Sequence, residues 1–261
     1  MQQKSTAGRA GLRIALVCSA LVTGSAATSW AQVASVVGPD EAPVGCPIQI
    51  NISNDTSVDV GTGVCPFLVL DASQSVIYDP ICIQILANID PGGTFNTEWP
   101  QIDDTGNQVA PGLYVVRVFE PDGDTTDHPI AIGDFAAGVA PLGVARVGTT
   151  RNYRLCAPDD GNGSYLMAAA FTNNVGIATC GGTLPLDMDG LFVLSQTAPA
   201  TFQNFSGLLD PAGESSAPAI AIPPLPGLAG TSFLLAFGVL DPSDPTCVVE
   251  TISSNLLMTI Q

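Results

Sequence analysis

Positive charge is scarce in this chain of 261 residues. Seven Lys and Arg residues stand against 24 Asp and Glu residues, with a single histidine, His128. Three of the cations, Lys4, Arg9 and Arg13, lie close to the N-terminus, so the remainder carries a net charge of about −20 (4 − 24). A surface of this charge repels phosphate, which argues against nucleic acid and anionic membrane surfaces as partners.

The motifs of common enzymes are also missing. His128 stands between Asp127 and Pro129, and no Gly-x-Ser-x-Gly elbow is present to supply a nucleophile for it. We interpret it as an exposed or structural residue rather than a catalytic base. The sequence has no Gly-x-x-x-x-Gly-Lys loop for phosphate, and the lack of Cys-x-x-Cys together with a single histidine argues against zinc. The sequence predicts a protein that is not an enzyme.

The N-terminal segment has the pattern of a cleaved export signal. A basic stretch ends at Arg13, the apolar residues 14–22 follow, and small residues lead to an Ala-x-Ala-like site at 29–31. The apolar stretch is shorter than the roughly 20 residues that a membrane span needs. We predict cleavage after Ala31 and a secreted or cell-surface protein, with an uncleaved anchor as the alternative. Cys18 lies inside the apolar stretch, which does not suit lipid attachment.

Six cysteines follow this segment: Cys46, Cys65, Cys82, Cys156, Cys180 and Cys247. An even number in an exported protein indicates disulfide bonds. The favoured pairs are Cys65 with Cys82 and Cys156 with Cys180, because each pair brackets a predicted hairpin. Cys46 and Cys247 would remain, and they could pair only if the two halves of the chain pack closely.

The rest of the sequence is typical of an all-β protein. Short runs rich in Val, Ile, Leu and Phe alternate with turns, and no helical period persists over a dozen residues. Such spacing favours sandwiches or barrels. The turn signals, built from Asp, Pro and Gly, lie at residues 90–93, 103–106, 121–124, 159–161, 187–190, 210–213 and 241–242.

Two segments of the first half show the alternation of a strand. In residues 47–53, isoleucines form one face and polar residues the other, which predicts one buried and one wet face. In residues 112–119, Arg117 lies on the opposite face from Tyr114, and a shift of register by one residue would bury its charge. The expected inward-facing residues are Ile48, Ile50, Ile52, Tyr114, Val116 and Val118.

In the second half, the strands are expected at residues 164–172, 217–223, 232–240 and 255–261. The run 232–240 is apolar on both faces, which predicts a central strand covered on both sides. The proline-rich run 222–227 predicts a loop or an edge. Arg146, Arg151 and Arg154 cluster near the expected junction of the two halves, and we interpret them as interdomain salt-bridge partners or strand-edge charges.

The first half resembles the immunoglobulin-like module found in flagellar hook-capping proteins and in many bacterial secreted proteins. The resemblance covers about residues 33–134 and depends on the alternating strand at 48–52, the strand pair around 71–74, and Trp99 before the turn 103–106 and the Pro-Gly-x-Tyr strand. The three cysteines in this half depart from the pattern. The resemblance implies a packing or accessory module rather than a catalyst.

The second half, about residues 140–261, is similar to a C-terminal β domain of secreted bacterial proteins without an assigned activity. The matching segments are 184–195, 205–213 and 222–230. Together these observations predict two β-sandwiches, Ig-like and then jelly-roll-like. The expected boundaries are a signal peptide at 1–31, the first sandwich at 32–134, a linker at 135–142 and the second sandwich at 143–261.

Calcium is the metal that the acidic turns favour, because clusters of carboxylates and loop carbonyls supply its oxygen ligands. Ordinary acidic turns are nevertheless the favoured interpretation, with a calcium site as the alternative, since Asp also favours turns through hydrogen bonds to the backbone and no EF-hand spacing is present. The candidate ligands are Asp122, Asp124, Asp127, Asp159, Asp160, Asn162, Asp187 and Asp189.

The sequence offers residues for two further kinds of site. Paired carboxylates of a glycoside hydrolase are conceivable at Asp103 and Asp104, at residues 159 and 160, or at 187 and 189, although turn chemistry explains each pair. Carbohydrate binding needs an exposed aromatic platform, whereas Trp99 is expected in the core.

The sequence therefore predicts a structural or adhesive, non-enzymatic protein of the envelope or matrix. Its expected partners are other envelope or matrix proteins or glycans. A calcium- or carbohydrate-binding accessory module is the alternative, and a hydrolase with paired Asp residues is the least favoured hypothesis.

Overall fold

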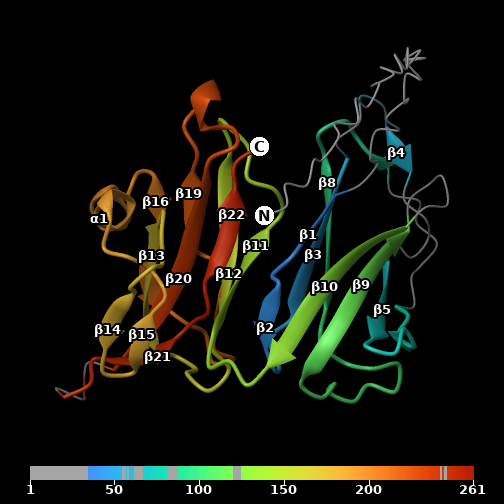
Figure 1. Cartoon of the computed structure of the whole chain (residues 1–261), viewed down its shortest axis with the longest axis horizontal. Helices are drawn as coiled ribbons and strands as arrows, with labels where there is room; N and C mark the ends of the chain where they lie inside the picture. Colours follow the sequence, from blue (N-terminus) through green and yellow to red (C-terminus); the bar gives the residue numbers. More distant parts are fainter. Residues whose placement is uncertain are drawn as a thin grey trace, which may run out of the picture. The chain divides into compact units, whose positions relative to one another are not determined.

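A computed structural model describes residues 35–54, 57, 59–61, 67–80, 88–119, 125–241, 243 and 246–261. All of them belong to the compact unit Ala31–Gln261 (Figure 1). The all-β prediction is confirmed, since the helical elements of the described residues are only the short α1 (Gly190–Thr197) and η1 (Pro226–Leu228). The predicted signal peptide and the predicted pair Cys65–Cys82 lie outside the described residues.

The first sandwich contains two main sheets. One has the order β1-β3-β8, and the other has the order β2-β10-β9-β5-β6. The strands of the first sheet are β1 (Ser35–Val37), β3 (Ile48–Ser53) and β8 (Thr94–Trp99). The strands of the second are β2 (Glu41–Pro43), β5 (Phe67–Asp71), β6 (Val76–Tyr78), β9 (Gly112–Phe119) and β10 (Thr125–Gly133). A short pair, β4 (Val60–Gly61) and β7 (Asn88–Ile89), completes this half.

The core of the first sandwich follows the predicted alternation. The isoleucines of β3 and the residues Tyr114, Val116 and Val118 of β9 are all buried in one cluster. Trp99 is fully buried in the same cluster, as expected, and its indole Nε1 donates a hydrogen bond to the carbonyl oxygen of Ile102. Arg117 lies on the outer face of β9, where it pairs with Asp127 of β10.

The second sandwich also has two main sheets. Their orders are β11-β12-β19-β16, with β18 beside β12, and β17-β13-β20-β21, with β22 beside β20. The first sheet consists of β11 (Gly138–Leu142), β12 (Thr150–Cys156), β16 (Phe202–Gln203), β18 (Glu214–Ser215) and β19 (Ala219–Ala221). The second consists of β13 (Ser164–Ala170), β17 (Ser206–Leu208), β20 (Ser232–Leu240), β21 (Val249–Ile252) and β22 (Leu256–Thr259). The hairpin β14 (Ile177–Thr179) and β15 (Gly182–Leu184) forms a separate two-stranded sheet.

Strand β20 is central and covered on both faces, as its sequence predicts. Phe233, Leu235 and Phe237 point into the core between the sheets. Ala236 joins a second cluster on the opposite face, where Phe192 of α1 also packs. Both faces of β20 are therefore apolar because each of them contacts a buried hydrophobic cluster.

Two expectations need correction. Residues 138–142, expected within a linker, form β11, which pairs along its whole length with β12 and begins the second sandwich. Residues 190–197 form α1, a helix too short to show a periodic pattern. The helix forms because the carboxylate of Asp189 caps it, accepting hydrogen bonds from the amides of Leu191 and Phe192.

Candidate functional site

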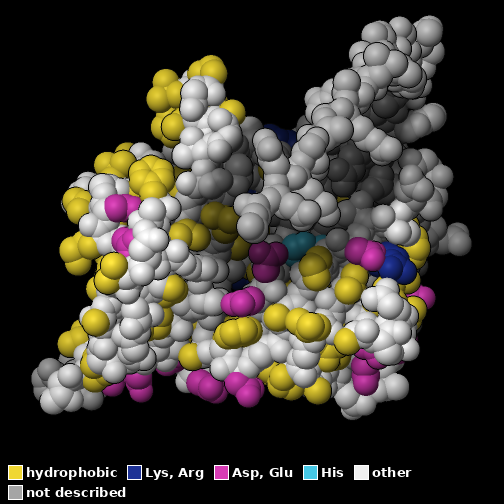
Figure 2. Space-filling model, viewed as in Figure 1, with side chains coloured by type: hydrophobic (Ala, Val, Ile, Leu, Met, Phe, Trp, Pro, Cys, Tyr) yellow, Lys and Arg dark blue, Asp and Glu magenta, His cyan; other side chains and the backbone are white. Residues whose placement is uncertain are grey.

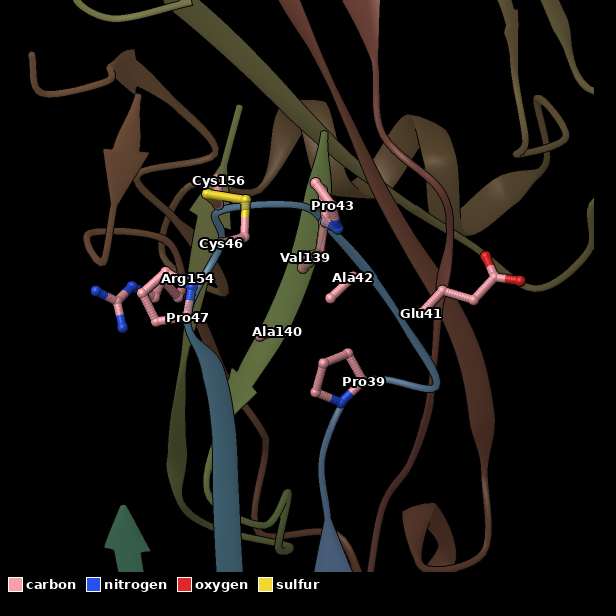
Figure 3. Close-up of a pocket in the computed structure, with 11 residues that line it drawn as sticks. Pro39, Glu41, Ala42, Pro43, Cys46, Pro47, Val139, Ala140, Arg154 and Cys156 are labelled. Carbon is pink, nitrogen blue, oxygen red and sulfur yellow. A yellow bond between two sulfur atoms is a disulfide. The ribbon is translucent and has the colours of Figure 1, made fainter. Parts of the chain in front are cut away.

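The two sandwiches meet at a cross-linked junction. A disulfide joins Cys46, which lies between β2 and β3, to Cys156 at the end of β12; the two cysteines are 110 positions apart in the sequence, and their Cα atoms are 6.0 Å apart. Figure 3 shows this bond beside Pro43 and Val139, while Glu41 points away from it. The disulfide therefore ties the first sandwich directly to a sheet of the second.

The predicted disulfide between Cys156 and Cys180 is wrong, and so is a pairing of Cys46 with Cys247. The second bond instead joins Cys180, in the turn of the β14–β15 hairpin, to Cys247, which precedes β21. Sequence proximity favoured a hairpin pair, but Cys156 ends a strand at the junction and Cys180 lies beside β21. The topology, rather than the spacing, decides which sulfur atoms meet.

Arg154 of β12 is the polar centre of the junction. Its Nη1 donates to a carboxylate oxygen of Glu98 in the first sandwich at 2.8 Å, and its Nη2 donates to Glu214 in the second at 2.7 Å. Its side chain is only 17% exposed. Burial by itself would lower the pKa of Arg154, but the hydrogen bonds with Glu214 and Glu98 outweigh it and the pKa is raised. The arginine thus stays charged and connects both halves, as its position in the sequence suggested.

The polar face of β3 contributes to the same junction. Gln49, Asn51 and Ser53 are buried, so the expectation of a wet face on this strand is wrong. The amide Nδ2 of Asn51 donates to the carbonyl oxygen of Pro141 in β11 at 3.0 Å. Alternation showed correctly that this face is polar, but a second sandwich covers it, which no local pattern reveals.

The two sandwiches pack closely beside the disulfide. A β-carbon on Gly138 would lie 2.7 Å from Cδ of Pro43, so the two sandwiches approach each other at a position that requires glycine. The adjoining pocket, between the disulfide and Arg154, has a volume of only about 20 Å³ (Figure 3). A cavity of this size holds about one water molecule. A separate pocket of about 160 Å³ lies between residues 39–41 of the first sandwich and residues 254–257 of the second.

The candidate calcium ligand Asp187 is occupied by protein donors. Its carboxylate accepts hydrogen bonds from the hydroxyl of Thr172 and from the amides of Asn174, Val175 and Gly176. The hydroxyl of Thr172 is the largest cause, and the amides add to it, in holding the pKa of Asp187 far below its usual range. These donors direct their hydrogens at the carboxylate. Such a carboxylate is better suited to holding the loop at residues 172–176 than to binding a cation.

The other candidate ligands lie apart or are similarly engaged. Asp189 caps α1 and also accepts from the amide of Phe171 at 2.6 Å. Asp127 pairs with Arg117, and this hydrogen bond lowers its pKa. Asp159, Asp160 and Asn162 lie together in the tight turn before β13, whereas Asp122 and Asp124 lie outside the described residues. Within the described ranges, no three His, Cys, Asp or Glu side chains come together as metal ligands.

Of the acidic pairs considered for hydrolysis, Asp103 and Asp104 both accept hydrogen bonds from backbone amides. Asp103 accepts from the amide and hydroxyl of Thr105 and from the amide of Asn107, and these hydrogen bonds lower its pKa. Asp104 accepts from the amide of Asp79 instead. His128 lies in β10, partly buried, with Nε2 3.3 Å from the carbonyl oxygen of Pro39.

Replacing Asp187 with asparagine should loosen the loop at residues 172–176. The folded-state pKa of this carboxylate is depressed, so its contribution to stability is present above about pH 4, the usual pKa of Asp, and is lost as the pH falls further. The melting temperatures of the wild type and Asp187→Asn, measured from about pH 6 down to about pH 2, should therefore converge as the pH falls. Asp159→Asn, in an exposed turn, is the matched control. A constant difference at all pH values would contradict this role.

No protein-family description and no curated protein matches the chain. Solved structures similar to it include a red sea bream transglutaminase (TM-score 0.30, 10% identity) and a Salmonella alpha-2-macroglobulin (0.28, 13%). A third is SGBP-B of a Bacteroides ovatus mixed-linkage glucan utilization locus (0.25, 12%). They cover 88%, 87% and 85% of this chain, which spans 31%, 15% and 43% of theirs. Similarities this slight assign neither a family nor a function.

Two features of the described residues bear on compartment. Two disulfide bonds are present, and such bonds are typical of proteins that fold in an oxidising environment. Neither described helix has the length and apolar character that crossing a bilayer requires.

The functional residues that sequence reasoning missed are Glu98 and Glu214, whose only sequence signal was the need of Arg154 for acidic partners.

Proposed function

We propose that this chain is a secreted or cell-surface, non-enzymatic structural protein: a stiff, acidic two-sandwich unit of a bacterial envelope or extracellular matrix. The observation that carries the proposal is the junction, where the Cys46–Cys156 disulfide and the two ion pairs of Arg154 hold the sandwiches together. A unit that only bound a small ligand through one sandwich would not need this connection.

The chemistry of the other polar residues supports the same proposal. The described acidic residues that accept hydrogen bonds do so mainly from nearby backbone amides or from arginines. Trp99 is buried and offers no platform for a sugar ring. The export pattern at residues 1–31 and the disulfides fit a location outside the cytoplasm. The partners are then other envelope or matrix proteins, met through surfaces rather than through a catalytic cleft.

Differential scanning calorimetry of the mature protein tests the mechanical part of the proposal. Two sandwiches held as one unit should unfold in a single transition, with equal calorimetric and van't Hoff enthalpies. Two well-separated transitions would show independent domains on a flexible connection and would contradict the proposal. Export is tested separately: protein recovered from the medium or cell surface of an expressing bacterium should begin at Gln32, and an unprocessed cytoplasmic product would count against it.

Arg154→Met should weaken the coupling between the sandwiches. The substitution removes hydrogen bonds to two carboxylates and leaves Glu214, which is 19% exposed, without its cation. Such a loss is expected to lower the free energy of unfolding by about 1–3 kcal/mol and to broaden or split the calorimetric transition. Arg117→Met is the control, because its partner Asp127 lies within the first sandwich. An equal effect of both variants would deny Arg154 a special role at the junction.

A further inference from the structure

An apolar pocket lies at one end of the second sandwich. Of its lining residues, Phe171 follows β13, Ile222 follows β19 and Ile260 follows β22, whereas Thr231 precedes β20. The pocket therefore opens where several strands of the two sheets begin or end. Its volume is about 280 Å³, close to the lower limit of ligand pockets, which is about 300 Å³.

The pocket reaches into the hydrophobic core between the two sheets. Five of its lining residues belong to the main core cluster of this sandwich and are at most 7% exposed: Phe202, Ile220, Ile222, Phe233 and Ile260. The first two lie on β16 and β19 of one sheet, and Phe233 lies on β20 of the other. The pocket is thus a space between the sheets rather than a depression among surface side chains.

Helix α1 forms one wall of the pocket. Leu191 and Leu194 are three positions apart, so they lie on one face of the helix, and both line the pocket. The hydroxyl of Ser195 accepts a hydrogen bond from the amide of Ala169 in β13 at 3.2 Å, and Phe192 packs against the cluster on the outer face of β20. Figure 1 shows α1 beside β13 and β16. These contacts fix the helix, and with it this wall.

Backbone hydrogen bonds hold other parts of the wall. The amide of Ile260 donates to the carbonyl oxygen of Thr231 at 3.0 Å, and the amide of Ala221 donates to the carbonyl oxygen of Thr201 at 2.8 Å. Both threonines and Ile260 line the pocket. Because its walls are held by contacts within the fold, the pocket exists before a ligand arrives, which lowers the cost of binding.

The rim of the pocket is apolar and open to solvent. Phe171 is 53% exposed and Leu194 is 48% exposed, although both line the pocket. In Figure 2, hydrophobic side chains gather over the part of the second sandwich where Figure 1 places α1. Exposed apolar side chains that continue into an apolar pocket are a feature of binding sites.

The chemistry of the lining restricts the class of ligand. Among the described residues that line the pocket, the polar side chains are those of Thr201 and Thr231, and none carries a charge. A carboxylate, phosphate or ammonium group inside the pocket would lose its hydration without gaining an ionic partner. The lining therefore favours an uncharged ligand that is mostly hydrocarbon.

The volume indicates the size of the ligand. An apolar cavity of about 150 Å³ stays free of water and binds benzene, and this pocket has nearly twice that volume. A phenylalanine side chain inserted by a partner protein, which is little larger than benzene, would fill only about half of it. A small molecule with roughly twice the carbon atoms of benzene would fill the whole space.

We propose that the pocket binds an uncharged, hydrocarbon-rich small molecule of about ten carbon atoms. Its hydrocarbon part lies between the sheets against the core residues, and a single hydroxyl or carbonyl group is accommodated at a threonine or at the open rim. This binding activity is independent of the structural role proposed above.

Isothermal titration calorimetry of the mature protein with 1-butanol, 1-hexanol and 1-octanol, at physiological salt, tests the proposal. Each methylene group buried in an apolar site tightens binding about fourfold, so each step of two methylenes should tighten binding by more than about tenfold. Equal affinities of the three alcohols would overturn the proposal. Absence of binding by 1-octanol up to its solubility limit would overturn it as well.

Octanoate and octylammonium test the preference for an uncharged ligand. Both have the chain length of 1-octanol, and both should bind at least about tenfold more weakly, because the pocket offers no ionic partner. The acidic surface of the protein acts on the two ions in opposite directions, so weaker binding of both is attributable to the pocket. Binding of either ion as tight as that of 1-octanol would contradict the assigned ligand class.

Two matched pairs of variants locate the ligand. Leu194→Trp and Leu228→Trp place a bulky ring at the lining, and each should weaken binding of 1-octanol at least about tenfold. Val193→Trp and Leu225→Trp are their controls, because these residues are 54% and 57% exposed, are close neighbours in sequence and do not line the pocket. Circular dichroism verifies that all four variants are folded. If both lining variants bind 1-octanol like their controls, the ligand lies elsewhere and the proposal is wrong.

Discussion

Replacing both Cys46 and Cys156 with serine is expected to lower the free energy of unfolding by about 2–5 kcal/mol. The bond closes a loop of 110 residues, and the entropy that a cross-link removes from the unfolded chain grows with loop length. The bond also joins two sandwiches, so its loss should do more than reduce stability. The single calorimetric transition should separate into two, because only non-covalent contacts, such as the ion pairs of Arg154 and the packing of Pro43 on Gly138, would then hold the first sandwich against the second.

The other disulfide supplies the control. Cys180 and Cys247 close a loop of 67 residues within the second sandwich. Their double serine variant should lower stability by a similar amount, about 2–5 kcal/mol, and yet keep a single transition. Calorimetry and urea denaturation of both variants measure the difference. If the Cys46/Cys156 variant unfolds like the wild type in both respects, the disulfide does not hold the junction together.

Trp99→Ala should destabilise the first sandwich by about 3–5 kcal/mol. Trp99 is fully buried at the end of β8, with its ring centroid 5.5 Å from that of Tyr114 and 6.5 Å from that of Tyr78. The substitution leaves a cavity and removes the hydrogen bond from Nε1 to the carbonyl oxygen of Ile102. Because the variant lacks the main fluorophore of this half, unfolding should be followed by circular dichroism.

Two further substitutions serve as comparisons for Trp99→Ala. Trp99→Phe keeps the aromatic contacts but loses the hydrogen bond, so it should cost less than the alanine variant. Leu113→Ala, on the exposed face of β9, should change stability by less than about 0.5 kcal/mol. A small effect of Trp99→Ala would mean that the core does not depend on its largest side chain. Such a result would also reopen a surface role for Trp99.

The strands were readable from the sequence wherever one face is apolar and the other polar. Residues 48–52 and 112–119 alternate because their inner faces contact a core, and 232–240 is apolar throughout because both of its faces are covered. The linker boundary and α1 were missed for the opposite reason. Strand β11 is small and weakly polar like a linker, and α1 is held by the cap of Asp189 and by contacts with β13 rather than by a periodic pattern.

Among the candidate sites, too, the sequence predicted some features and missed others. The turn chemistry of Asp103 and Asp187 was one of the two alternatives that composition allowed, and the hydrogen bonds of each residue favour it. The pairing of the cysteines was wrong because spacing along the chain does not determine which strand ends meet. Arg151 and Arg154 looked equivalent in sequence, yet Arg151 is buried with no ion pair to any described residue, and Arg154 connects two carboxylates.

The sequence by itself determined the all-β class, the acidic surface and the inward-facing residues, because these follow from composition and from the two-residue period of a strand. Only the tertiary structure decided the disulfide partners, the burial of the polar face of β3, the junction at Arg154 and the pocket beneath α1. The bonds that define the disulfides and the junction join residues 56 to 110 positions apart in the sequence. Contacts at such separations are set by how the sheets pack, which no local pattern encodes.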